Sequence, residues 1–479
     1  MSNTAQTSAM DRINLLLDEN SFVEIGANVT KRSTDFNLQE KSVPGDGVIT
    51  GYGVIDGNLV YVYSQDSSSL GGSMGEMHAK KIARIYDMAL KMGAPVVGLV
   101  DCAGLRLQEA TDALAGFGEL YLKQTLASGV VPQITAVFGT CGGGSAVSAL
   151  LGDFTFMAES GSKLFVNAPN TIAGNYVEKC DTSSAKFQSE AGTADFVEAD
   201  EQTVLTKVRE LVGILPANNE DDASYDECSD DLNRPSYDAG SKDSAKALAD
   251  LSDNNFFMEV KKDYAKDMVA GFIRLNGMTV GAVANRSEIQ DENGKVTQKM
   301  EARLSAEGCV KAADFVSFCD AFDIPVLTLT NVEGYMATAC SEKTMAKAAA
   351  KLTYAFANAS VPKVNVVTGK AFGSAYLAMN SKHIGADMVF ALDGSQIGTM
   401  DAKEAVKIIY ADEVKDSDAV LNEKANEYKK LQSSAESAAQ RGYVDAVIEA
   451  ADTRKNIIYA YEMLFTKREN RPAKKHGTV

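Results

Sequence analysis

Residues 131–157, VPQITAVFGTCGGGSAVSALLGDFTFM, are the stretch on which the interpretation of the fold depends. An apolar run typical of a buried strand leads into Gly142, Gly143 and Gly144, and a small-residue pattern typical of a helix follows. A strand that ends in glycines and then starts a helix leaves backbone N–H groups at the helix N-terminus, where they can face an anion. The alternative is that the glycines only allow close packing of the helix on the sheet.

The same pattern occurs a second time in the later half of the chain. The segment MGAPVVGLVDCAGLRLQEA aligns with FDIPVLTLTNVEGYMATACSE, and the alignment continues downstream at the same offset. Lys81 and Lys311 each open a helical pattern that ends at a matched proline. Repeated matches at one constant offset predict an internal duplication. The matched pairs are Pro95 with Pro325, Asp101 with Asn331, Gly104 with Gly334, Pro132 with Pro362, and Gly143 with Gly373.

Each copy contains two continuous apolar runs separated by a helical pattern. The runs lie at residues 96–100 and 134–138 in the first copy, and at residues 326–330 and 364–368 in the second. Continuous apolar strands that alternate with helices are typical of parallel sheets covered by helices on both faces. The sequence therefore predicts two copies of one α/β module.

The glycine-bearing loops follow these strands, and in an open parallel sheet the ligand site lies beyond the C-terminal strand ends. The loops at 103–105 and 142–144 are therefore expected to converge in the first copy, and those at 333–335 and 373–375 in the second. Convergent backbone N–H groups in each copy predict two oxyanion holes. Between the copies, residues 218–253 are acidic and poor in apolar residues, which predicts a linker or an irregular surface segment.

Length and composition restrict the function classes. A chain of 479 residues predicts two or three domains, and its net charge of −18 argues against nucleic acid or an anionic membrane as a partner. Charged residues interrupt the N-terminal apolar run, and Pro132 and Gln133 interrupt the longest uncharged run, so we expect a cytoplasmic protein without a targeting or membrane segment. The seven cysteines form no CxxC pair, which predicts buried small side chains and no metal site.

Catalytic side chains are scarce. The chain has three histidines, no HExxH motif and no Walker lysine loop. One GxSxG match occurs at residues 71–75, but Ser73 does not follow a strand directly, so a nucleophilic role is not favoured. His383 is expected to pack locally. A site built from backbone donors suits reactions in which negative charge develops on a thioester oxygen.

Several motifs, in order along nearly the whole chain, resemble the carboxyltransferase (beta) subunits of biotin-dependent acyl-CoA carboxylases, and the alpha subunits of the related decarboxylases. This resemblance implies two tandem crotonase-like domains, each with a parallel sheet and flanking helices, at residues 1–225 on the acyl-CoA side and 240–479 on the biotin side. It also implies CO2 transfer between carboxybiotin on a separate carrier protein and the α-carbon of a short-chain acyl-CoA. The motifs include GDGVITGYGVIDGNLVYVYSQD, LGGSMGEMHAKKI, LASGVVPQITAVFGTCGGGSAVSALLGDFTFM and VPKVNVVTGKAFGSAYLAMNSKHIGADMVFAL.

The resemblance also implies the roles of the loop residues. One oxyanion hole, for the thioester enolate, combines the N–H of Leu105 with that of Gly143 or Gly144. The other, for the ureido oxygen of biotin, combines the N–H of Tyr335 with that of Gly373, Ser374 or Ala375. Biotin itself acts as the base. The substrate-lining positions that the resemblance implies are Ala103, Gly104, Gly142, Gly334, Tyr376 and Leu377. Propionyl-type members of the family it resembles tend to carry Asp at the last of these positions.

Partners follow from the same resemblance. We expect a biotin carboxyl carrier protein and either a biotin carboxylase subunit or a membrane decarboxylase subunit. At least a homodimer is expected, and a ring of three dimers is common among relatives. Lys91 in ALKMGAP resembles a biotin acceptor, but it closes a helix before the first repeat strand and no carrier domain surrounds it.

Alternatives remain open at this point. The loops NVEGYMATACSEK and 170–200 depart from the family pattern, which favours a different acyl-CoA or the reverse reaction of a sodium-pumping decarboxylase of the methylmalonyl-CoA type. A crotonase-like hydratase or isomerase would use the same holes with Glu109 as acid or base. A non-catalytic scaffold that holds the carrier is a further alternative.

Overall fold

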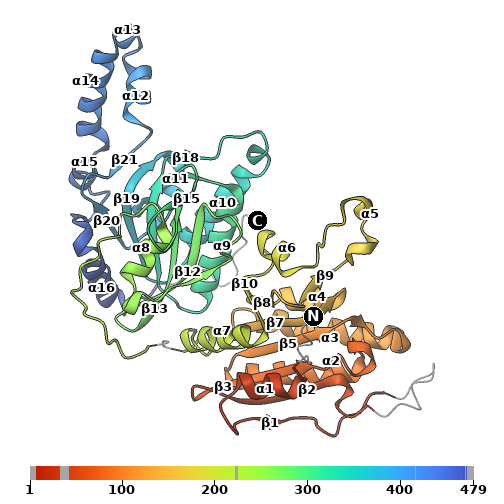
Figure 1. The fold of residues 1–479 in the computed structure, drawn as a ribbon. Helices are drawn as coiled ribbons and strands as arrows, with labels where there is room; N and C mark the ends of the chain where they lie inside the picture. Colours follow the sequence, from red (N-terminus) through yellow and green to blue (C-terminus); the bar gives the residue numbers. More distant parts are fainter. Residues whose placement is uncertain (1–6, 33–42, 222–224, 416, 470, 472–479) are drawn as a thin grey trace. The chain divides into compact units, whose positions relative to one another are not determined.

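The computed structural model describes residues 7–32, 43–221, 225–415, 417–469 and 471. The chain forms two compact units, Met1–Ser224 and Tyr225–Val479 (Figure 1). Each unit contains an eight-stranded sheet with helices on both faces. The predicted fold class of two α/β modules is therefore confirmed.

The sheet of the first unit has the order β1-β2-β3-β5-β7-β8-β10, with β9 paired to β7. β1, β2 and β3 pair in antiparallel fashion and the remaining pairs are parallel. The strands are β1 Val23–Glu24, β2 Val48–Ile55, β3 Asn58–Gln65, β5 Val96–Cys102, β7 Gln133–Gly142, β8 Phe154–Ala158, β9 Lys163–Phe165 and β10 Phe196–Glu198.

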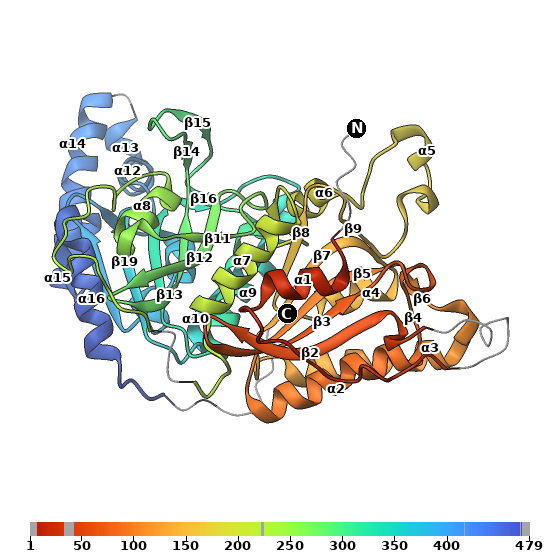
Figure 2. The ribbon, with the colours of Figure 1, turned by 60° about the horizontal axis from the view of Figure 1, so that its bottom comes forward.

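Helices cover both faces of this sheet (Figure 2). α2 (Glu76–Met92) packs against α3 (Ala110–Ala127) on one face, and α1 (Ala9–Leu16) packs against α7 (Glu201–Ile214) on the other. All seven residues of β5 are buried, because the strand is covered on both sides. This explains why its sequence is almost continuously apolar.

The second unit repeats this arrangement with the order β11-β12-β13-β17-β19-β20-β22 and β21 paired to β19. α9 (Ala306–Ala321) packs against α10 (Met345–Asn358), while α8 (Ser244–Leu251) and α16 (Thr453–Leu464) contribute to the core on the other face. The strands are β11 Met258–Val260, β12 Met268–Leu275, β13 Met278–Asn285, β17 Val326–Val332, β19 Lys363–Phe372, β20 Met388–Leu392, β21 Gln396–Gly398 and β22 Ala446–Ile448.

The duplication is confirmed strand by strand. β5 and β17, and β7 and β19, begin and end at positions that the sequence offset matches to each other. The same offset relates β4 (Ser73–Met74) to β16 (Arg303–Leu304), and β6 (Gly104–Leu105) to β18 (Gly334–Tyr335). The strands extend further than the apolar runs alone predict, because parallel pairing continues into the glycine loops.

Each unit also has a helical insertion after the short strand that pairs with its longest strand. The short strand is β9, beside β7, in the first unit and β21, beside β19, in the second. In the first unit the insertion contains α5 (Asn175–Glu178) and leads to α6 (Ala185–Glu190). In the second it contains α12 (Ala402–Ile409), α13 (Ala411–Val414) and α14 (Asp418–Tyr428), and leads to α15 (Ala435–Gln440). Figure 1 shows that α12–α14 project from the second unit.

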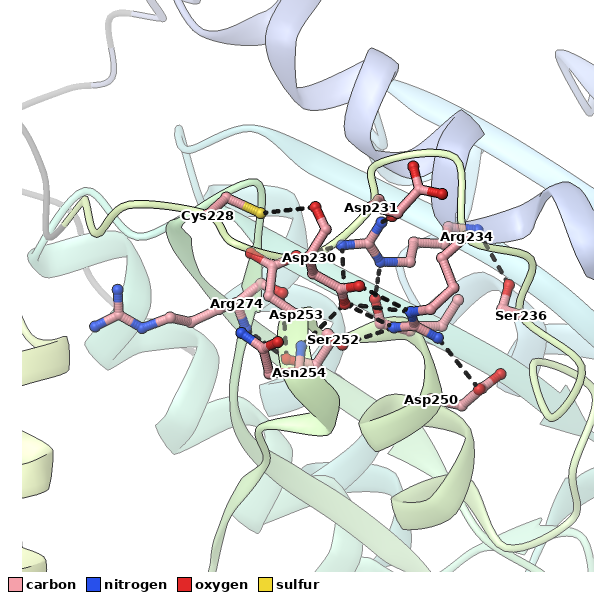
Figure 3. A network of polar contacts seen from close by, with 12 residues as sticks. Cys228, Asp230, Asp231, Arg234, Ser236, Asp250, Ser252, Asp253, Asn254 and Arg274 are labelled. Carbon is pink, nitrogen blue, oxygen red and sulfur yellow. Dashed lines mark hydrogen bonds and ion pairs between the residues drawn. The ribbon is translucent and has the colours of Figure 1, made fainter.

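Polar contacts hold residues 228–236 of the predicted linker against the second unit (Figure 3). Arg454 is fully buried and donates to the carboxylate of Asp253 and, at 2.8 Å, to the carbonyl of Asp231. Arg234 forms ion pairs with Asp230 at 3.2 Å and with Asp250 at 3.6 Å. The alternating Asp and Arg side chains thus attach this acidic segment to the second unit.

The expectation of linker or irregular structure up to residue 253 is wrong for its last part. Residues Ser244–Leu251 form α8, with Ala247, Leu248 and Leu251 in the hydrophobic core. These apolar residues have helical spacing, and the acidic composition of the preceding residues obscured them.

Candidate active site

The first glycine turn lies between β7 and α4 (Gly144–Leu150). Gly143 has φ 58° and ψ −123°, a conformation suited to glycine. Its N–H donates to the carbonyl of Phe165 at 2.9 Å, so this group is already engaged. Gly144 is the first residue of α4, and its N–H has no partner within the helix. Of the two predicted donors, the N–H of Gly143 is therefore occupied, which leaves that of Gly144 as the candidate.

The second donor of the first unit is set by the pairing of β6 with β4. Ala103 N–H donates to the carbonyl of Gly72, and Arg106 N–H donates to the carbonyl of Met74, each at 2.9 Å. Successive N–H groups of an extended strand point to opposite sides, so the N–H of Leu105, next to that of Arg106, points away from β4, and Gly104, with φ 118°, breaks the alternation after Ala103. β4 and β6 form a sheet of two strands, so within the described ranges no strand pairs with the outer edge of β6.

The two loops meet backbone to backbone. A Cβ atom on Gly104 would lie 3.3 Å from the carbonyl oxygen of Gly142, and one on Gly142 would lie 3.1 Å from that of Ala103. α4 also contacts β6. The structure therefore brings the predicted residues 103–105 and 142–144 together at the C-terminal edge of the sheet.

The second unit reproduces these contacts at the matched positions. Glu333 N–H donates to the carbonyl of Ala302 at 2.7 Å, and Met336 N–H donates to that of Leu304 at 2.9 Å. The N–H of Tyr335, next to that of Met336, therefore points away from β16, and Gly334, with φ 154°, breaks the alternation after Glu333. The two bonds are the counterparts of those made by residues 103 and 106, so the duplicated sequence encodes duplicated donor geometry.

α11 (Gly373–Ala378) begins at the second turn and contacts β18. Gly373 has φ 61°, and a Cβ atom there would lie 3.2 Å from the carbonyl of Thr399. Ser374 corresponds to Gly144 in the repeat. Burial raises the pKa of Tyr335, and the neighbouring Ser374 hydroxyl opposes this shift. The predicted second set, residues 334–335 and 373–375, is thus also brought together.

Two further predicted residues lie on α11. Tyr376 is buried, burial raises its pKa to about 12, and its hydroxyl has no hydrogen-bond partner among the described residues. Leu377 is 38% exposed, so its side chain is partly open to solvent beside the turn. His383 packs its ring edge-on against Tyr443 at 4.9 Å between centroids, as local packing predicts.

A buried charge cluster, missed from the sequence, holds the first donor loop. Arg106 is 1% exposed, and its Nη1 donates to Asp46 at 2.6 Å and to Glu109 at 2.8 Å. Its Nη2 donates to the carbonyl of Ser73 at 2.8 Å. Burial raises the pKa of Asp46, and the Arg106 cation opposes this shift. Because Arg106 directly follows Leu105, these bonds fix the orientation of the donor.

This cluster also accounts for two alternative catalytic residues. Ser73 Oγ donates to the carbonyl of Leu70 at 2.8 Å and accepts from Arg106 Nε at 3.3 Å, so it is a structural hydroxyl. Glu109 is 3% exposed and accepts the N–H of Glu76 at 2.7 Å in addition to its ion pair with Arg106. Both groups are occupied by structural contacts.

Asp101 and Asn331 lie at matched positions where the pairing register of each sheet shifts, and their side chains bond to the neighbouring strand there. The register shifts after Val100 in the first sheet and after Thr330 in the second. Asp101 Oδ1 accepts the N–H of Thr140 at 3.1 Å, and Asn331 Oδ1 accepts that of Lys370 at 2.9 Å. Side chains of this length bridge the gap that the shifted register opens.

The bridging side chains require a second pair of glycines that sequence reasoning missed. A Cβ atom on Gly139 would lie 2.0 Å from Asp101 Oδ1, and one on Gly369 would lie 2.4 Å from Asn331 Oδ1. The signal was available, because Gly139 and Gly369 are separated by the same offset as the other matched pairs.

The remaining predictions concern metals, membranes, the acceptor-like lysine and cysteines. Within the described ranges, no group of three His, Cys, Asp or Glu side chains could hold a metal ion, and no helix is long and apolar enough to cross a bilayer. Lys91, the residue that resembles a biotin acceptor, lies in the last turn of α2.

Four of the seven cysteines are buried as predicted: Cys102, Cys141, Cys309 and Cys319. Two others, Cys180 and Cys340, are exposed because they lie in loops outside the sheets, and the side chain of Cys228 is partly buried.

The profile of the carboxyl transferase domain family matches residues 3–479. The alpha subunit of methylmalonyl-CoA decarboxylase from Propionigenium modestum is 39% identical over 493 residues, covering 99% of this chain and 93% of that protein. The propionyl-CoA carboxylase beta chain from Roseobacter denitrificans is 40% identical over 486 residues, covering 98% of this chain and 93% of that protein.

A solved structure with the same fold is that of transcarboxylase 12S, described as a hexamer with hydrolysed methylmalonyl-coenzyme A bound. It superimposes with a TM-score of 0.91 at 37% identity and covers 98% of this chain and 92% of that one.

Proposed function

Because the chain belongs to the carboxyl transferase domain family, we propose that it is an enzyme subunit that moves CO2 between carboxybiotin and the α-carbon of a short-chain acyl-CoA. The carboxybiotin is carried by a separate protein. The observation that supports this proposal is the duplicated pair of backbone donors, one pair at the strand ends of each unit.

The first pair is suited to the thioester. When the α-carbon of an acyl-CoA loses its proton or its carboxylate, negative charge develops on the thioester oxygen. The N–H groups of Leu105 and Gly144 are fixed by β6 and α4, so they stabilise this charge without reorganisation and without a proton of their own to lose. Ala103, Gly104 and Gly142 are predicted to line the substrate, and their close backbone approach brings these two donors together.

The second pair fits a urea. The N–H groups of Tyr335 and of Ser374, on the first turn of α11, offer donors to an oxygen that becomes more negative when a carboxyl group leaves the adjacent nitrogen. Biotin supplies this nitrogen, which carries the carboxyl group in one state and accepts the α-proton of the acyl-CoA in the other. The chain's own part is to hold the ureido oxygen, with Gly334 and Gly373 as the turns that allow the approach.

The two donor pairs belong to different units, and we propose that each complete site combines the first unit of one chain with the second unit of another. A homodimer is then the smallest active form, and a ring of three dimers agrees with the hexameric transcarboxylase 12S relative. The partners proposed are a biotin carboxyl carrier protein and either a biotin carboxylase or a membrane decarboxylase subunit.

The direction of transfer depends on those partners. The relatives include a decarboxylase alpha subunit and a carboxylase beta chain at nearly equal identity, so the same site serves both directions. The reverse reaction, as the alpha subunit of a sodium-pumping decarboxylase, is therefore the second candidate function. A hydratase is disfavoured, because Glu109 is committed to Arg106 and to the N–H of Glu76.

The experiment uses the purified chain with free biotin and malonyl-CoA or methylmalonyl-CoA. We expect release of CO2 that requires both the acyl-CoA and biotin, because either direction of transfer includes this half-reaction. A parallel assay with crotonyl-CoA should show no hydration. Absence of acyl-CoA-dependent CO2 release at any biotin concentration would overturn the proposed function.

A further inference from the structure

The two donor sites differ in the side chains at their rims. In the first unit the residues before the two turns include Ala103 and Thr140, which carry no charge. At the matched positions of the repeat, the second unit has Glu333 and Lys370. Lys370 Nζ lies 2.7 Å from Glu333 Oε1, and the two side chains are 36% and 38% exposed. Only the second of these two rims therefore carries this ion pair.

The ammonium group of Lys370 is close to both loops of the second site. Glu333 directly precedes the strand β18, which carries the Tyr335 donor. Lys370 lies shortly before Phe372 on β19, and its Nζ is 6.0 Å from the centroid of the Phe372 ring. Phe372 in turn precedes Gly373. The backbone N–H of Lys370 is held by Asn331 at 2.9 Å, which fixes the start of the side chain.

We propose that Lys370 binds the carboxylate of the carboxylated urea at the second site, and that Glu333 is the counter-ion to which the ammonium returns. This inference rests on the proposed function, which brings such a urea to the donors of Tyr335 and Ser374. A carboxylate on the ureido nitrogen carries a full negative charge, and a lysine beside the hole neutralises it.

The pairing with Glu333 matters for the transfer step. When the bond between nitrogen and the carboxyl carbon breaks, its electron pair stays on the ureido nitrogen and oxygen, and CO2 leaves without charge. A cation that stabilised the carboxylate alone would oppose this step, because it favours the ground state over the transition state. Glu333 takes the ammonium back as the negative charge leaves the carboxyl group, so Lys370 assists binding without retaining the carboxylate.

The test measures binding rather than turnover. Two biotin derivatives are compared by titration calorimetry, one with a charged carboxymethyl group on the ureido nitrogen and one with its neutral methyl ester. Wild-type protein should bind the charged derivative about tenfold more tightly than the ester. Lys370→Met should abolish this preference and Lys370→Arg should keep it. Glu333→Gln should strengthen binding of the charged derivative about threefold, because it removes the competing carboxylate.

Lys382→Met is the matched control. Lys382 is 35% exposed and also forms an ion pair, with Asp445. Asp445 lies beside the beginning of β20, at the opposite end of the sheet from the donor turns. This variant loses one positive charge and one ion pair from the same unit, but it should keep the preference for the charged derivative.

Kinetics supply an independent readout. With carboxybiotin as the donor, Lys370→Met should raise KM about tenfold and leave kcat within about threefold, whereas Glu333→Gln should lower KM and kcat together. These opposite patterns would not follow from a merely structural ion pair.

The outcomes separate the two proposals. If wild-type protein binds both derivatives and Lys370→Met retains the charge preference, the role of Lys370 is overturned and the proposed function stands. If Lys370→Met loses instead the preference for malonyl-CoA over acetyl-CoA, the lysine serves the acyl-CoA carboxylate and the inference is wrong. If wild-type protein binds neither derivative, the proposed function fails and this inference with it.

Discussion

Replacement of Gly144 by proline removes one backbone donor while leaving most of its surroundings unchanged. Proline is well accommodated at the first position of a helix, because the N–H there has no intrahelical partner. Gly144 occupies that position in α4, and its carbonyl, which accepts the hydroxyl of Tyr121 at 2.7 Å, is retained in the variant. The only group lost by design is the proposed oxyanion donor.

Gly144→Ala is the matched control. A Cβ atom at this position would lie 3.0 Å from the hydroxyl of Tyr121 and 3.1 Å from the ring of Phe117, so both variants crowd these side chains. Alanine keeps the N–H, and proline does not. The ratio of the two variants therefore reports the donor rather than the crowding.

The expected size follows from the role of the donor. Loss of one oxyanion-hole donor costs about 2.7–4 kcal/mol of transition-state stabilisation, which lowers kcat by roughly 10²–10³-fold. Biotin-dependent CO2 release from malonyl-CoA is the assay, with near-ultraviolet circular dichroism to confirm folding. KM should change little, since the charge develops only in the transition state. A folded proline variant within about threefold of the alanine variant in kcat would refute the assignment of Gly144.

Arg106→Met should lower the free energy of unfolding, measured in urea, by about 3–5 kcal/mol, because it leaves the buried carboxylates of Asp46 and Glu109 without a cation. Leu377→Asp should shift the ratio of kcat/KM toward methylmalonyl-CoA over malonyl-CoA by about tenfold, because Leu377, partly exposed beside the second turn, is predicted to line the acyl pocket. Burial lowers the pKa of His78 from 6.5 to about 3, so between these pH values the unfolded chain binds a proton that the folded chain does not. Stability should fall with decreasing pH in this window, by up to about 1.4 kcal/mol per unit, and less steeply in His78→Gln.

Each of these expectations has a contrary result. A loss below about 1 kcal/mol in Arg106→Met, no greater than that of the partly exposed Arg209→Met, would show that the cluster does not hold its carboxylates as charges. An unchanged acyl-CoA preference in Leu377→Asp would remove Leu377 from the acyl pocket. Parallel pH profiles of wild type and His78→Gln would mean that another group causes the acid sensitivity.

Much of the fold could be predicted because the sequence contains two copies of the same α/β module. The constant offset between the two copies, visible in a few prolines and glycines, recurs in the bounds of the strands and in the hydrogen bonds of β6 and β18. Strand patterns and turn glycines are local features, and the ends of parallel strands share one edge of a sheet. Local pattern and topology together therefore indicated the two donor turns.

The rest depends on contacts between distant residues. The N–H of Gly143 donates to the carbonyl of Phe165, which leaves Gly144 as the proposed donor. This contact follows from the position of β9 and not from any local signal. Nothing near Arg106 in the sequence indicates that it is buried, because its partner Asp46 lies far earlier in the chain. Likewise, the helix α8 is stabilised because Ala247 and Leu248 pack in the core of the second unit. The acidic composition of the preceding segment gave no indication of this packing.

The central claim is that one site combines the first unit of one chain with the second unit of another. It is tested most directly by coexpressing Gly144→Pro and Ser374→Pro chains, each inactive alone. If sites are shared between chains, half of the assembled dimers contain one site with two intact donor pairs, and the mixture should recover about a quarter of wild-type biotin-dependent CO2 release. If instead the mixture shows no more activity than the two variants measured separately, each site lies within a single chain and the account is wrong.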